Sequence, residues 1–220
     1  MGQDRDVDVT ARGFLFDCDG VLVDSDASVH AAWSRWAVEH GFDPDDVYAQ
    51  VHGRRAADTV ALLVPDAAQQ GESLQRINVL ELEAAGDVPP IPGAPELVAA
   101  VPPGAWAAVT SGTRPLARAR LQAAGLPLPD VMVTADDVTA GKPAPEGYLA
   151  AAAALGLAPA DCVVLEDAVA GVLAARAAGV GTVIGVGERA LATDADVVVA
   201  DLRALTVVDG GLRVAGSRLR

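Results

Sequence analysis

The chain has 220 residues, of which 51% are hydrophobic and 21% are charged, so it can bury a substantial core and is not a globally disordered polypeptide. Its formal net charge of −14 disfavours nucleic acid and anionic membranes as partners. No segment is long and apolar enough to span a bilayer.

The first predicted element is a short strand over the apolar run 13–16, followed at once by Asp17, Cys18, Asp19 and Gly20. If the strand alternation continues, both aspartates lie on one face, side by side. Two like charges at the end of a buried strand are costly unless a cation or a proton lies between them. The pair is therefore a candidate catalytic or metal-binding site.

The segment from about residue 26 to 88 carries only helical signals. Helices are predicted over 28–40, 45–51, 57–63 and 66–85, with a break near Gly71 in the last of them. The run Pro89-Pro90-Ile91-Pro92-Gly93 ends this region. We therefore expect a helical cap domain over 26–88, inserted into a core made of 1–25 plus 89–220.

Beyond the proline-rich run, strands and helices alternate. Strands are predicted at 106–110, 131–133, 162–165, 181–186 and 197–199, and helices at 115–124, 145–155 and 168–178. Apolar strands that do not alternate, separated by helices, are typical of a parallel sheet covered on both faces. The expected fold is a doubly wound α/β core, and the strand at 13–16 belongs to its sheet.

Polar residues follow four of these strands, where ligands gather in doubly wound sheets. They are Asp17 and Asp19 after the first strand, Ser111-Gly112-Thr113 before a helix, Gly141-Lys142-Pro143 in a loop, and Glu166-Asp167 after the strand at 162–165. Carboxylates, a hydroxyl, an amide-rich turn and an ammonium group suit a phosphoryl group together with Mg²⁺.

These four motifs, in this order, resemble those of the haloacid dehalogenase (HAD) superfamily. The quoted stretches are Phe16-Asp17-Cys18-Asp19-Gly20-Val21-Leu22-Val23-Asp24-Ser25, Val109-Thr110-Ser111-Gly112-Thr113, Gly141-Lys142-Pro143 and Val164-Leu165-Glu166-Asp167-Ala168. The branch with a small helical cap is the most similar, in particular bacterial sugar-phosphate phosphatases and the glycerol-3-phosphate and 2-deoxyglucose-6-phosphate phosphatases. The resemblance covers about residues 11–210.

The resemblance implies a Mg²⁺-dependent phosphatase for a small sugar or polyol phosphate. Asp17 would attack phosphorus and form an aspartyl-phosphate, while Asp19 would protonate the leaving group and then deprotonate water. The implied phosphate-binding residues are Ser111, Gly112 and Lys142. The implied metal ligands are Asp17, Asp19 through its backbone carbonyl, Asp167 and, through water, Glu166. In the cap, His52 and Arg54 are the candidates for substrate contact.

Two other functions share parts of this pattern. A sugar phosphomutase has the same core, but the resemblance places its hinge histidine at Val29 and its cap arginine at Ala56, so hydrolysis is favoured. A phosphoaspartate signalling module also combines acids, a hydroxyl and Lys-Pro, but it is shorter and has no helical insert. Asp19 argues against a true haloacid dehalogenase, which needs neither this residue nor a metal.

The two cysteines, Cys18 and Cys162, lie in apolar runs and are expected to be buried thiols of a reducing compartment. The acidic start of the chain does not resemble a signal peptide. We therefore expect a cytoplasmic protein whose partner is a small phosphorylated metabolite. The oligomeric state is left open, with a monomer preferred.

Overall fold

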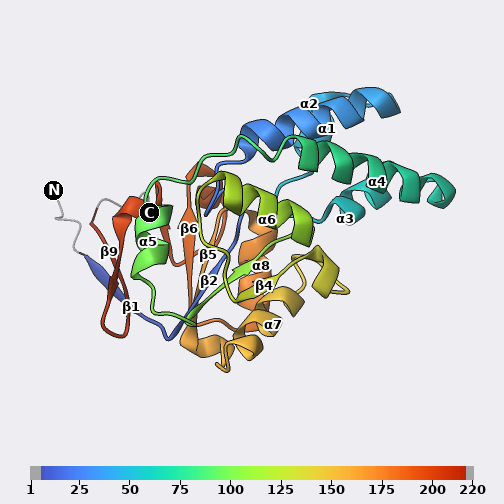
Figure 1. Cartoon of the computed structure of the whole chain (residues 1–220). Helices are drawn as coiled ribbons and strands as arrows, with labels where there is room; N and C mark the ends of the chain where they lie inside the picture. Colours follow the sequence, from blue (N-terminus) through green and yellow to red (C-terminus); the bar gives the residue numbers. More distant parts are fainter. Residues whose placement is uncertain (1–5, 217–220) are drawn as a thin grey trace.

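A six-stranded parallel sheet forms the centre of the fold (Figure 1), in a computed structural model that describes residues 6–216. Its strands are β2 (Gly13–Phe16), β3 (Trp106–Val109), β4 (Val131–Val133), β5 (Cys162–Glu166), β6 (Thr182–Val186) and β7 (Val197–Val199). Their order is β4-β3-β2-β5-β6-β7, and every neighbouring pair is parallel. The chain direction across the sheet reverses between β2 and β5. The carboxyl ends of this central pair therefore form the position where doubly wound folds bind ligands.

Helices cover both faces of the sheet, which confirms the predicted doubly wound fold. One face packs against α5 (Ala94–Ala100) and α6 (Arg114–Ala123), and the other against α7 (Glu146–Ala154) and α8 (Val169–Ala178). In β2, Phe14 and Phe16 enter the first of these cores and Leu15 enters the second. Each fully buried side chain of this size contributes roughly 1.5–3 kcal/mol, so both faces hold β2 in place.

Four further helices are inserted between β2 and β3: α1 (Asp26–His40), α2 (Pro44–Tyr48), α3 (Ala56–Leu63) and α4 (Ala67–Glu83). We call this segment the cap. Figure 1 shows it above the carboxyl ends of the central strands. The cap has its own apolar cluster, in which Trp33 and Trp36 are buried with their ring centroids 5.4 Å apart. The division into a core and a separate cap domain with the bounds given above stays a prediction.

The predicted break near Gly71 is wrong, because α4 runs through this residue without interruption. Gly71 is exposed, and no atom lies within 4 Å of the position a Cβ would take. A single glycine inside a helix costs about 1 kcal/mol relative to alanine. The burial of Ile77 and Leu80 in the cap cluster outweighs that cost.

A small antiparallel sheet was not predicted. It consists of β1 (Val7–Thr10), β9 (Gly211–Val214) and β8 (Leu205–Val208), in that order. The turn Asp209-Gly210 between β8 and β9 is a hairpin signal that could have revealed it. Short 3₁₀ turns occur at η1 (Ala135–Asp137), η2 (Pro159–Asp161), η3 (Glu188–Ala192) and η4 (Leu202–Ala204).

Cys18 and Cys162 are buried free thiols, as predicted. Within residues 6–216, none of the helices combines the length and the apolar character needed to cross a bilayer.

Candidate active site

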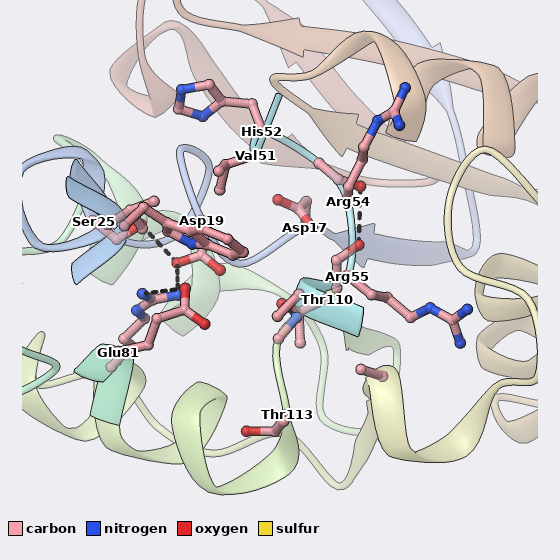
Figure 2. Close-up of a pocket in the computed structure, with 18 of the residues that line it drawn as sticks. Asp17, Asp19, Ser25, Val51, His52, Arg54, Arg55, Glu81, Thr110 and Thr113 are labelled. Carbon is pink, nitrogen blue, oxygen red and sulfur yellow. Dashed lines mark hydrogen bonds and ion pairs between the residues drawn. The ribbon is translucent and has the colours of Figure 1, made fainter. Parts of the chain in front are cut away.

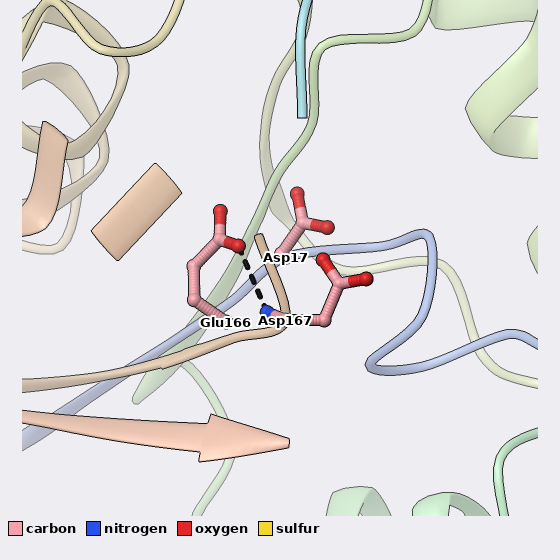
Figure 3. Close-up of side chains that lie close together, drawn as sticks. All are labelled: Asp17, Glu166 and Asp167. Carbon is pink, nitrogen blue, oxygen red and sulfur yellow. Dashed lines mark hydrogen bonds between the residues drawn. The ribbon is translucent and has the colours of Figure 1, made fainter. Parts of the chain in front are cut away.

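Three buried carboxylates meet at the carboxyl ends of the central strands (Figure 3). Asp17 follows β2, Glu166 ends β5 and Asp167 comes next, and one oxygen from each lies within 4.8 Å of the others. Their exposed fractions are 6%, 0% and 5%. Carboxylate oxygens grouped in this way are the ligands that Mg²⁺ prefers. The residues present therefore fit a divalent cation.

Lys142 is the ammonium group that faces this cluster. Its Nζ donates to Asp17 Oδ1 and to Glu166 Oε1, each at 2.5 Å, and to the carbonyl oxygen of Val109 at 3.2 Å. Burial alone lowers the pKa of Lys142, but the two carboxylates outweigh it and hold the pKa well above its usual range. Lys142 is therefore a fixed positive charge beside Asp17.

Lys142, together with Arg189 beside Asp167, brings two positive charges to three carboxylates. The pKa shifts show the consequence of this incomplete neutralisation. Burial raises the pKa of Asp17 well above its usual range, Lys142 opposes that shift, and Glu166 and Asp167 add to it. Burial and the charge of Glu166 also raise the pKa of Asp167, to about 7. The cluster thus favours either a bound proton or an added cation.

Glu166 is fully occupied by hydrogen bonds. Its Oε1 accepts from Lys142 and from the hydroxyl of Tyr148 at 2.8 Å, and its Oε2 accepts from the backbone N–H groups of Asp167 and Ala168 at 2.9 and 3.1 Å. These contacts position Lys142 and the residues that directly precede α8. The metal contact through water that the resemblance implied for Glu166 stays a prediction.

Gly171→Ala is expected to destabilise the protein by about 3 kcal/mol, because it displaces Glu166 from its buried partners. A Cβ at Gly171 would lie 1.7 Å from Glu166 Oε1. The matched control is Gly71→Ala, also in the first turns of a helix but with open space around the added methyl group. It should stabilise the protein by about 0.5–1 kcal/mol. Urea unfolding of both variants checks this, and equal stabilities would contradict it.

The turn after β3 carries the predicted phosphate-binding residues Ser111 and Gly112. Ser111 Oγ donates to the carbonyl oxygen of Gly53, in the cap, at 3.0 Å, and the N–H of Gly112 donates to Thr110 Oγ1 at 3.0 Å. Gly53 has φ +73°, and a Cβ there would lie 2.8 Å from that of Ala168. The cap backbone thus approaches the core closely, and phosphate bound by Ser111 would have to replace this cap contact.

Asp19, three residues beyond the end of β2, is not one of the three clustered carboxylates. Its Oδ1 accepts from Ser25 Oγ at 2.6 Å and from Arg120 Nη1 at 2.9 Å (Figure 2). Sequence reasoning missed Arg120. The signal was its place among Leu116, Ala117 and Leu121, on the buried stripe of α6, where a charged residue needs a partner.

Arg189, in η3, is a second missed residue. Its Nε and Nη2 donate to Asp167 Oδ2 at 3.0 and 2.6 Å, and its Nη1 donates to Asp26 Oδ2 at 2.6 Å. It therefore connects the acidic cluster to the first residue of α1. No pattern in the sequence indicates this contact, since Arg189 lies in a short 3₁₀ turn.

A cavity of about 270 Å³ lies between the cap and the core. The predicted site residues in its lining are Asp17, Asp19, His52, Arg54, Ser111, Gly112 and Asp167, whereas Lys142 and Glu166 lie outside it. Burial lowers the pKa of His52, whose ring contacts Tyr48 edge-on. Figure 2 shows the side chains of His52 and Arg54 turned away from Asp17. Substrate contact by these two residues stays a prediction.

Comparison with known proteins agrees with this geometry. The family model for haloacid dehalogenase-like hydrolases matches residues 11–179. Hexitol phosphatase A of Escherichia coli is 47% identical over 76% of this chain and 80% of its own length. 2-Deoxyglucose-6-phosphate phosphatase 2 of Saccharomyces cerevisiae is 32% identical over 88% of this chain and 89% of its own length. The crystal structure of a hydrolase from Pseudomonas syringae superposes with a TM-score of 0.76 and 27% identity, over 88% of this chain and 94% of that one.

A doubly wound sheet with acidic residues at its central strand ends, beneath inserted helices, defines the class of protein. The chain belongs to the haloacid dehalogenase-like hydrolase family. Within it, the chain is a phosphoric monoester hydrolase. The predicted resemblance to sugar-phosphate phosphatases is confirmed.

Proposed function

We propose that this protein is a Mg²⁺-dependent phosphatase that hydrolyses a small sugar or polyol phosphate through an aspartyl-phosphate on Asp17. The observation that carries the proposal is the buried Asp17, held by Lys142 and open to a cavity beneath the cap. The names of the relatives, which include a hexitol phosphatase and a 2-deoxyglucose-6-phosphate phosphatase, support the substrate class.

In the proposed reaction, Asp17 attacks phosphorus while Lys142 neutralises charge on the phosphoryl oxygens. Asp19, which must carry a proton when the substrate is bound, turns from Ser25 and Arg120 to donate that proton to the leaving oxygen. The resulting carboxylate then removes a proton from the water that hydrolyses the aspartyl-phosphate. Asp17, Asp167 and the backbone carbonyl of Asp19 would hold Mg²⁺, with Glu166 contacting it through water. The bound ion supplies positive charge that favours ionised Asp17 and offsets charge on the transferring group.

Ser111 and Gly112 would hold the remaining phosphate oxygens. The cap domain, residues 26–88, would exclude water during the attack and reopen for release. A cavity of about 270 Å³ admits a small metabolite and not a phosphorylated protein. We place this activity in the cytoplasm, in a monomeric enzyme.

The test is phosphate release from a panel of hexose, pentose, hexitol and glycerol phosphates, with Mg²⁺ and with EDTA. Release from at least one of them, lost in EDTA and restored by Mg²⁺, is the expected result. A rate of phosphate release in EDTA equal to that in Mg²⁺ would exclude a requirement for the metal. Interconversion of 1- and 6-phosphate isomers without free phosphate would indicate the phosphomutase, and stable phosphorylation without turnover would indicate a signalling module.

A further inference from the structure

The side of the cap helix α4 that meets the cavity carries two polar residues beside one apolar residue. Leu74, Asn78 and Glu81 all line the cavity, and their spacing of four and three residues places them on the same side of the helix. Glu81 also follows Ile77 and Leu80 into the buried face of α4, with an exposed fraction of 8%. A carboxylate in that position needs a charged or hydrogen-bonding partner, because burial of a charged group is costly.

The polar groups around Glu81 are incompletely paired. Arg120 Nη2 lies 3.6 Å from Glu81 Oε1, longer than a normal hydrogen bond. Arg120 Nη2 and Nε and the indole Nε1 of Trp33 are buried and make no hydrogen bond to any residue in 6–216. The side-chain amide of Asn78, one turn from Glu81, is half-buried and makes no hydrogen bond to a residue in that range. Buried groups left in this state are expected to acquire partners when a ligand binds.

We propose that Glu81, Asn78 and Arg120 form a subsite for the hydroxyl groups of the substrate, and that the enzyme prefers monophosphates with an uncharged, hydroxylated tail. This inference rests on the proposed function. Glu81 would accept hydrogen bonds from hydroxyl groups, Asn78 would accept or donate, and Arg120 would donate. Because Arg120 also binds Asp19, the subsite adjoins the candidate acid.

The charges around the cavity explain why the tail should be uncharged. While Asp19 is ionised, Asp19, Arg120 and Glu81 carry a formal charge of −1 together, which repels a second anionic group as the substrate enters. Two further arginines in the lining are neutralised by ion pairs within the protein. Arg55 pairs with Asp58, and Arg189 pairs with Asp167 and Asp26. Among the arginines in the lining, only the exposed Arg54 makes no ion pair with a described residue, and it is turned away from Asp17 (Figure 2).

The experiment compares Glu81→Gln and Asn78→Ala with the wild type and with Glu83→Gln. Glu83 is on the same helix, but its side chain is 60% exposed, so it is a matched control. The substrates are a hexitol 6-phosphate, p-nitrophenyl phosphate, which has no hydroxyl groups, and an aldonic acid 6-phosphate. For each variant, the ratio of kcat/KM for the hexitol phosphate to that for p-nitrophenyl phosphate is measured.

Loss of a hydrogen bond to a hydroxyl group should lower this ratio about tenfold in Asn78→Ala and by tenfold or more in Glu81→Gln. Glu83→Gln should leave it unchanged. Glu81→Gln should also raise the rate with the aldonic acid phosphate relative to the hexitol phosphate. Unchanged ratios in Asn78→Ala, or equal wild-type rates on the charged and uncharged tails, would overturn the subsite alone. A wild type that releases phosphate from none of these compounds would overturn the proposed function itself.

Discussion

Asp17→Asn should lower phosphate release by at least about 10⁴-fold, since an amide cannot act as the attacking carboxylate. The fold should survive, because Asn retains an oxygen that can accept from Lys142. Burial raises the pKa of Asp17 in the folded protein, so the ionised side chain opposes folding at pH values above its usual pKa. In EDTA at pH 7, Asp17→Asn should therefore unfold at the same or a higher temperature than the wild type.

Two comparisons make this result specific. Asp130→Asn changes an exposed aspartate and should have the wild-type rate. Asp19→Asn should form the phosphoenzyme slowly, if at all, and should not break it down, which rapid-quench labelling with ³²P-substrate would detect. A wild-type rate for Asp17→Asn would remove the proposed mechanism, because every later step depends on a bond between phosphorus and this carboxylate.

Lys142→Met should reduce both activity and stability strongly. The chain contains 16 Lys and Arg residues, and Lys142 is its only lysine. Removing it leaves Asp17 and Glu166 buried without their shared cation, and breaking a buried pair in this way costs about 3–5 kcal/mol. Activity should fall by about 10²–10³-fold, the loss expected when one fixed donor to the transition state is removed.

The pH dependence separates this electrostatic effect from simple loss of packing. Lys142 lowers the pKa of Asp17 against the larger effect of burial, so its removal lets that pKa rise further. The variant should be destabilised more at pH 7 than at pH 5, because the fraction of Asp17 that is ionised in the folded protein falls as the pH falls. Urea unfolding at both pH values measures this. Destabilisation that is equal at the two values would indicate a packing role instead.

Lys142→Arg should not restore activity. The Lys142 side chain is only 8% exposed, and a planar guanidinium is larger and directs its donors differently from an ammonium group. Wild-type activity in this variant would contradict the close fit of the ammonium group between Asp17 and Glu166.

Local sequence patterns were sufficient to predict the parallel sheet and the residues at its strand ends. Apolar runs separated by helices are local signals, and parallel strands bring their carboxyl ends to one edge. Asp17, Lys142, Glu166 and Asp167 could therefore be expected to meet, and the structure brings them together. The break predicted at Gly71 failed because tertiary packing of α4 outweighed a local propensity.

The groups that surround those residues could not be predicted from the sequence and became clear from the three-dimensional fold. Arg120 binds Asp19, which is 101 residues away in the chain, and also lies beside Glu81 of the cap. Arg189 binds Asp167, which is 22 residues away, and also pairs with Asp26 of the cap. Such contacts depend on how the cap lies on the core and on which side chain enters a shared buried space, and neither leaves a periodic pattern in the chain. Burial makes partners energetically necessary for Arg120, Glu81 and Asp167, because a charge removed from water must be paired within the fold.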